Sequence, residues 1–288
     1  MKEENLKRAK EIVKSIDLPP QPRVVLELYR IFKEPDPDTG RIIRLVSDDL
    51  ALSAKLIKLA NSPLLGGGRK IDSIRQAFMN LGSENFYGMV LTSALRDALA
   101  GQCDNKGLFD GFWNHCLQIA KVTELIVLKA PTVASMVPLN LAYLAGLFHD
   151  CAMPLLIKRY PEYISVFNSV LCNEPLCIET EESRFGTNHA LISYFVSKSW
   201  QLPIPVCNAI LNHHEAEPDD SCEVVARKLR SILILGEHLS PCDRNAAEEE
   251  ISEEDLDGSL VGALNELYLS ANQMPNLRRE VQSISSRD

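Results

Sequence analysis

The sequence predicts an all-α protein, and three observations support this. Apolar residues recur at the three- and four-residue spacing of amphipathic helices along almost the whole chain. No run of strand length shows the alternation of apolar and polar residues that is typical of a half-buried β-strand. The 288 residues are 45% hydrophobic and 24% charged, which excludes a disordered or fibrous chain. At roughly 100–200 residues per domain, this length allows one large domain or two lobes.

The first 100 residues predict a series of short helices. Three prolines between 19 and 22 indicate an extended entry segment, because each proline disfavours helical geometry in the residue before it. Helices are then expected over about 23–32, 41–46, 52–60, 74–81 and 84–99, with a glycine-rich loop at 66–68 and Gly82 as a stop signal. A DNA-binding helix-turn-helix over 48–82 is disfavoured, because the segment between its two helices is too long.

The glycine-rich stretch 101–111 is the expected boundary between an N-terminal lobe, 1–102, and a second lobe, 103–242. Further helices are predicted over about 112–129, 139–150, 161–172, 187–200, 204–214 and 223–239. The remaining segment, 243–288, is expected to hold a solvated acidic loop at 243–257, one last helix near 258–271 and a polar tail.

The charge distribution, the first ten residues and the longest apolar stretch exclude several classes of protein. The first 100 residues carry 16 basic and 13 acidic groups, a net of +3, and the rest carry 14 and 26, a net of -12. Neither part shows the clustered basic face of a nucleic-acid binder. The first ten residues lack the apolar region of a signal peptide. The longest apolar stretch, 139–148, is far shorter than the ~20 residues that span a bilayer. We therefore expect a cytoplasmic protein that binds neither nucleic acid nor membrane.

All six histidines and all eight cysteines lie between Cys103 and Cys242. In a cytoplasmic protein the cysteines are expected to be reduced thiols, and the absence of a CxxC pair argues against a thioredoxin-like or cysteine-rich zinc site. Burial as small apolar residues is the favoured interpretation. A thiol redox sensor is a weaker alternative, because Cys116 adjoins His115 and Cys151 adjoins Asp150.

Seven chemically active residues fall on the apolar faces of five predicted helices. They are His115, His149, Asp150, His189, His213, His214 and Glu237. A buried polar group without a partner costs roughly 1–3 kcal/mol. Seven such groups on converging faces would most readily satisfy one another, either in a hydrogen-bond network or around a metal. Neutral imidazole and carboxylate are suitable ligands for zinc, iron or manganese.

The order of these residues resembles the HD superfamily of metal-dependent phosphohydrolases, and the whole chain resembles the HDOD family of bacterial signalling output domains. The segments LPPQPRVVLELYRIFKEPDPD, VSDDLALSAKLIKLANSP and KIDSIRQAFMNLGSENF carry the HDOD resemblance most specifically, within a match over about 17–240. It implies two packed helical lobes, the second a degenerate HD-like bundle. It also implies a regulatory module that acts through a signalling protein or a second copy of the chain, with the N-terminal lobe as the binding element.

The resemblance also implies roles for single residues. In catalytic HD enzymes, the residues matching His115, His149 and Asp150 bind a metal that activates water for attack on phosphorus. Glu237 stands where the family has a late aspartate. In two-metal relatives the further ligands would be His189, His213 and His214.

Two departures from those relatives favour a non-catalytic protein. Ala152 and Met153 replace a Gly-Lys pair, and Gly111 replaces a second carboxylate. The alternative is a divergent metal-dependent phosphohydrolase of a phosphoester or nucleotide, with Asp150 as its catalytic residue. In that case Lys121, Lys158 or Arg184 could lie near the phosphate.

Overall fold

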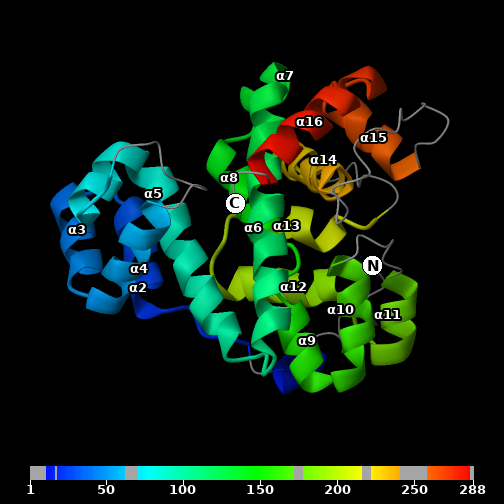
Figure 1. Ribbon diagram of the computed structural model, residues 1–288, viewed down its shortest axis with the longest axis horizontal. Coiled ribbons are helices and arrows are strands. Elements are labelled where there is room, and N and C mark those ends of the chain that lie inside the picture. Colours follow the sequence, from blue (N-terminus) through cyan, green and yellow to red (C-terminus); the bar gives the residue numbers. More distant parts are fainter. Residues whose placement is uncertain are drawn as a thin grey trace. The chain divides into compact units, whose positions relative to one another are not determined.

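The computed structural model describes residues 11–16, 18–61, 70–171, 178–215, 222–240 and 258–285 (Figure 1). Every regular element within these residues is a helix, which confirms the all-α fold class. The chain divides into two compact units. The smaller one is centred on Pro20–Ala98, and the larger one is centred on Leu99–Ser283 and takes in Pro19. The domain boundaries expected at 102 and 242 stay predictions.

The smaller unit contains α2 (Arg23–Phe32), α3 (Thr39–Ser47), α4 (Leu50–Ala60) and most of α5 (Ile74–Ala100). Two aspartates cap these helices, because the Asp38 carboxylate accepts from the backbone N–H of Arg41, and Asp49 accepts from that of Leu52. Gly82 interrupts α5 with a φ of 76°, a left-handed conformation that glycine adopts without strain. The predicted stop at Gly82 is therefore confirmed, although the helix resumes at once.

The larger unit contains most of the helices. They are α6 (Lys106–Lys129), α7 (Pro131–Ala134), α8 (Leu139–Phe148), α9 (Met153–Arg159), α10 (Ile164–Leu171), α11 (Ile178–Phe185), α12 (His189–Ser199), α13 (Ile204–Asn212), α14 (Val224–Leu239), α15 (Gly258–Glu266) and α16 (Met274–Ser285), with single 3₁₀ turns at Pro161–Tyr163 and Ala271–Gln273. Figure 1 shows α6 and α8 side by side. Gly146 of α8 permits this close packing, because a Cβ there would lie 2.7 Å from the Ala120 Cα.

The structure corrects three expectations about the helices. α6 begins at Lys106, inside the glycine-rich stretch, because the Asn105 side chain caps it by accepting from the backbone N–H of Leu108. The helix expected near 258–271 ends at Glu266. The expected polar tail instead forms α16, whose residues Met274, Leu277 and Val281 are buried at helical spacing. The loops expected at 66–68 and 243–257 lie outside the described residues.

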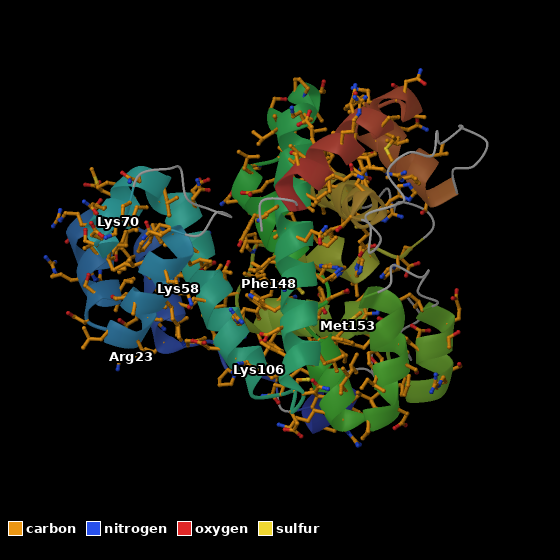
Figure 2. The ribbon with its side chains drawn as sticks, in the orientation of Figure 1. Arg23, Lys58, Lys70, Lys106, Phe148 and Met153 are labelled. Atoms are coloured by element: carbon orange, nitrogen blue, oxygen red, sulfur yellow. The ribbon has the colours of Figure 1, made fainter. Side chains whose placement is uncertain are left out.

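One segment among the described residues, Leu139–Arg159, is long and apolar enough to cross a membrane by length and composition. It joins α8 to α9, and 83% of its most apolar window is buried inside the protein. This burial is typical of a core segment of a helical bundle. Figure 2 labels Phe148 and Met153, the two residues that flank the turn between α8 and α9. That turn carries His149 and Asp150.

Candidate metal centre

The structure brings all seven residues of the predicted set together in the larger unit. His115 lies on α6, and His149 and Asp150 lie in the turn after α8. His189 begins α12, His213 and His214 lie in the turn after α13, and Glu237 lies on α14. Helix ends supply most of them. This is a common construction for metal sites in helical bundles, where side chains from facing helices project inward.

Asp150 lies between two groups of histidines. Its Oδ2 atom is 3.2 Å from His149 Nε2 and 3.7 Å from His115 Nε2. Its Oδ1 atom is 3.5 Å from His189 Nε2 and 3.9 Å from His213 Nε2. The residue is buried, with 2% of its surface exposed. Each carboxylate oxygen therefore faces a different histidine pair.

Glu237 occupies a similar position on another side of the cluster. Its Oε1 atom is 3.5 Å from His149 Nε2 and 3.6 Å from His213 Nε2. The longer glutamate side chain thus reaches two of the four histidines that Asp150 faces. On the far side, His214 Nε2 is 2.9 Å from His189 Nε2.

Backbone carbonyls orient two of the histidine rings. His149 Nδ1 is 2.7 Å from the carbonyl oxygen of Gly146, and His213 Nδ1 is 2.6 Å from that of Ile210. A carbonyl can only accept a hydrogen bond, so the Nδ1 atom of each neutral ring carries the proton. The lone pair then lies on Nε2, which faces Asp150 and Glu237. This is the tautomer and orientation that metal-binding histidines require.

Several polar atoms at this point have no hydrogen-bond partner in the described part of the chain. They are the Nε2 atoms of His115, His149 and His213 and the Oδ1 atom of Asp150, all buried. Leaving one buried acceptor or donor unsatisfied costs about 1–3 kcal/mol. Their convergence therefore fits a bound cation better than a closed hydrogen-bond network. Two triads have ligand atoms within 4.8 Å of one another: His115, His149 and Asp150, and His189, His213 and His214.

Burial and mutual charge shift the pKa values of these groups in opposite directions. Burial raises the pKa of Asp150, but His149 and His189 outweigh it and hold that pKa well below its usual range. Burial lowers the pKa of His189, but Glu181 and Asp150 outweigh it and raise that pKa to about 9. Burial, assisted by His189, lowers the pKa of His214 to about 3.

Burial lowers the pKa of His149, but Asp150 and Glu237 outweigh it and raise that pKa. Two further shifts follow mainly from burial. Burial and the neighbouring His214 and His189 hold the pKa of His213 well below its usual value. Burial raises the pKa of Glu237 to about 7, and the nearby His149 reduces that rise. The cluster therefore mixes charged and neutral groups near neutral pH, as functional sites often do.

Two residues next to the centre were not among those predicted. Glu181 of α11 is 1% exposed and accepts hydrogen bonds from His189. Arg230 of α14 is buried and donates from Nε to the Asn212 carbonyl at 2.9 Å and from Nη2 to the Glu215 carbonyl. Arg230 thereby ties α14 to both sides of the turn that carries His213 and His214. Neither role is evident in the sequence, where both residues stand in polar helical stretches.

Four of the remaining candidates are buried or contact other side chains, and Lys121 is also buried and interacts electrostatically with Glu124. Cys116 and Cys151 are buried, and burial raises both of their thiol pKa values, which disfavours the reactive thiolate and the redox-sensor alternative. Lys158 donates to the Gln102 side chain at 2.8 Å. The guanidinium of Arg184 lies over the ring of Phe185. Both cations are therefore engaged with other side chains.

Comparison with known proteins identifies the family. The sequence profile of the HDOD domain matches residues 18–216, which is more than half of the chain. The chain belongs to the HDOD family. A crystal structure of an HDOD domain protein of unknown function from Geobacter sulfurreducens has a TM-score of 0.69, with 25% identity and 98% of each chain covered.

Two curated relatives of this HDOD protein are longer than it is. An uncharacterised protein of Treponema pallidum is 27% identical over 208 residues, covering 69% of this chain and 38% of that protein. The cyclic di-GMP phosphodiesterase CdgJ of Vibrio cholerae is 27% identical over 193 residues, covering 66% of this chain and 42% of that protein. The chain thus spans about two fifths of the length of each curated relative.

Proposed function

We propose that this HDOD protein is a signalling module whose larger unit binds divalent metal and which acts through protein interaction rather than by substrate turnover. The observation that carries the proposal is the convergence of buried Nε2 atoms and a carboxylate oxygen that have no partner among the described residues. Iron, manganese and zinc all suit a site of imidazole and carboxylate.

The arrangement supports two cation positions. His115, His149 and Asp150 would hold one, and His189, His213 and His214 would hold the other. Asp150 and Glu237 lie within 4 Å of histidines from both triads, so either carboxylate could bridge the two positions. A divalent cation bound there would lower the pKa of a water molecule and polarise a phosphoryl oxygen.

Departures from the phosphate-binding pattern of two-metal relatives support the non-catalytic proposal. Ala152 and Met153, which stand where two-metal relatives have Gly-Lys, are both fully buried. No Lys or Arg within the described ranges forms an ion pair with Asp150 or Glu237. A phosphodiester would also meet the net charge of -12 that residues 101–288 carry.

A metal-dependent phosphohydrolase of a phosphoester or nucleotide is the second candidate. The complete set of seven side chains supports it, because a purely structural role needs neither free Nε2 lone pairs nor two carboxylates. The similarity to CdgJ, named as a cyclic di-GMP phosphodiesterase, points to the same class of reaction. Asp150 would be the residue on which activity depends.

Metal analysis and a hydrolysis assay test both candidates. The purified protein is expected to contain iron, manganese or zinc by mass spectrometry, and Asp150→Ala is expected to lose it. Bis(p-nitrophenyl) phosphate and cyclic dinucleotides, with added Mn²⁺, Fe²⁺ or Zn²⁺, are expected to show no turnover above the Asp150→Ala level. Turnover that disappears in Asp150→Ala would establish the second candidate. A protein without metal that also binds none when it is added would exclude the metal centre.

Protein interaction is the output that we propose for the module. The partner is a signalling protein or a second copy of the chain, and the smaller unit is the proposed binding element. Light scattering of the purified chain distinguishes a dimer from a monomer. A monomer that cross-links to no signalling protein in cells, with no contacts from residues 20–98, would contradict this part of the proposal.

A further inference from the structure

We propose that Glu181 is a positioning residue of the metal centre, which orients the His189 ring so that its Nε2 atom faces Asp150 and His214. The inference rests on the proposed metal centre, which supplies the reason for that orientation. Its physical basis is the difference between the two ends of a helix.

Histidines that follow a helix find an acceptor within their own segment. His149 and His213 follow the last residues of α8 and α13, where backbone carbonyls lack intrahelical partners. Each Nδ1 atom bonds the carbonyl three residues earlier, that of Gly146 or Ile210. Local helix geometry is therefore sufficient to orient these two rings.

His189 is in the opposite situation because it is the first residue of α12. No turn of that helix precedes it to offer a carbonyl, and its own backbone N–H has no acceptor within the helix. Asn188, the capping residue, uses its side-chain oxygen on the N–H of Leu191. An acceptor for both the ring and the N–H of His189 must come from another helix.

Glu181 of α11 supplies both acceptors. Its Oε1 atom is 2.7 Å from His189 Nδ1, and its Oε2 atom accepts from the His189 backbone N–H at 2.8 Å. Tyr163 donates its hydroxyl to the same Oε2 at 2.7 Å, which orients the carboxylate in turn. All three residues are buried, with at most 1% of their surface exposed. Hydrogen bonds to a charged acceptor are about twice as strong as those to a neutral one.

The His189 ring therefore depends on a second helix, whereas the His149 and His213 rings depend on local carbonyls. A glutamine at position 181 keeps the shape but has only one acceptor oxygen, so one of the two His189 N–H groups loses its partner. Loss of such an outer hydrogen bond typically lowers metal affinity 10- to 100-fold.

The adjacent Glu182 offers a matched control. Its Oε1 atom accepts from the side-chain nitrogen of Asn188 at 2.8 Å, whereas both carboxylate oxygens that His189 uses belong to Glu181. Glu182→Gln thus changes the same charge one residue away without removing an acceptor from His189.

The experiment compares Glu181→Gln, Glu182→Gln and Tyr163→Phe in the full chain. Cobalt titration, followed by visible absorption, is expected to show two binding events in the wild type. Glu181→Gln is expected to weaken one event 10- to 100-fold, and Glu182→Gln less than threefold. Long-range ¹H–¹⁵N spectra of the metal-free protein are expected to show a changed chemical shift of His189 Nδ1 in Glu181→Gln. The same signal is expected to stay unchanged in Glu182→Gln.

Equal effects of the two glutamate variants, or an unchanged His189 signal in Glu181→Gln, would overturn the proposal. If the wild type binds no cobalt, the proposed metal centre fails, while the ring spectra still decide the role of Glu181. If Glu181→Gln does not fold, Tyr163→Phe decides, because it removes only the hydroxyl that orients the carboxylate. In Tyr163→Phe the chemical shift of His189 Nδ1 is expected to change less than in Glu181→Gln, and an unchanged shift would refute the positioning role.

Discussion

The two units bury different kinds of residue although both are built from helices. In the smaller unit, the described buried residues are apolar apart from Thr92 and Ser93. The larger unit buries ionisable side chains as well, among them Asp150, Glu181 and Lys228. Packing of apolar helix faces is thus enough to hold such a unit together, whereas the larger unit also encloses ionisable groups, several of them in the candidate metal centre. Buried ion pairs contribute little net stability, and leaving one partner alone is costly.

The positions of the tryptophans allow the two units to be followed separately. Both tryptophans of the chain, Trp113 and Trp200, are buried in the larger unit. Tryptophan fluorescence therefore reports unfolding of the larger unit, while circular dichroism reports both. Hydrogen exchange of peptides from α4 and α8 adds local resolution.

The largest effect is expected for Asp150→Ala. The change removes a buried carboxylate between two histidine groups and so breaks the buried charge pairing that Asp150 makes with His149 and His189, at a cost of about 3–5 kcal/mol. Denaturation followed by tryptophan fluorescence measures the loss. Asp104→Ala, which alters an exposed aspartate of the same unit, is the control. Equal denaturation midpoints for the two variants would mean that the buried charge cluster does not contribute to the stability of the larger unit.

The reverse test is Leu56→Ala in the smaller unit. Leu56 is fully buried in α4, so the change creates a cavity that costs about 2–5 kcal/mol. Faster hydrogen exchange is expected in α4 peptides, with an unchanged tryptophan transition and unchanged metal content. A shifted tryptophan transition would show that the two units unfold together.

Acid is expected to destabilise the metal-free larger unit between about pH 4.5 and pH 3. The pKa of His214 is lowered to about 3 and that of Asp150 lies well below its usual value, so the unfolded chain binds more protons in this range. Each such proton lowers stability by about 1.4 kcal/mol per pH unit. Glu237, with its pKa raised to about 7, has the opposite sign, but below about pH 4 it is largely protonated in both the folded and the unfolded chain. Fluorescence-detected denaturation at several pH values measures the slope, and a flat profile would contradict the shifts.

The smallest effect is expected for Lys55→Ala. Lys55 Nζ lies 2.6 Å from Asp97 Oδ2 in the smaller unit, but both side chains are about half exposed. Water screens such a pair, so its loss should cost about 0.2–1 kcal/mol. Hydrogen exchange in α4 measures it. A loss above about 2 kcal/mol would show that surface charge matters to the smaller unit as much as its apolar core.

The sequence predicts more of this fold than of its supporting contacts. Apolar spacing identifies α2 to its exact bounds, Arg23–Phe32, because that pattern reports burial directly. It misses α16, whose buried Met274, Leu277 and Val281 stand among many polar residues. It also misses α11, since an acidic segment is typical of a solvated surface.

The same limit applies to the candidate site. Histidines on apolar helical faces are conspicuous in the sequence, and the structure groups all seven candidate residues in one place. The apolar spacing of the sequence does not reveal Glu181, because its burial depends on contacts with Tyr163 and His189, which come from other segments. Specific hydrogen bonds between side chains of different helices produce no periodic pattern in the sequence, so periodicity cannot predict them.

Gly146 has a consequence for the choice of ion. It brings the backbones of α8 and α6 so close that any larger residue would collide with Ala120. His115 lies on α6 and His149 follows α8, so contact between backbones, rather than flexible side chains, sets the separation of these two candidate ligands. A spacing maintained in this way adapts poorly to ions of different radius. We therefore expect the first triad to discriminate among cations by size, and Gly146→Ala to broaden that selectivity.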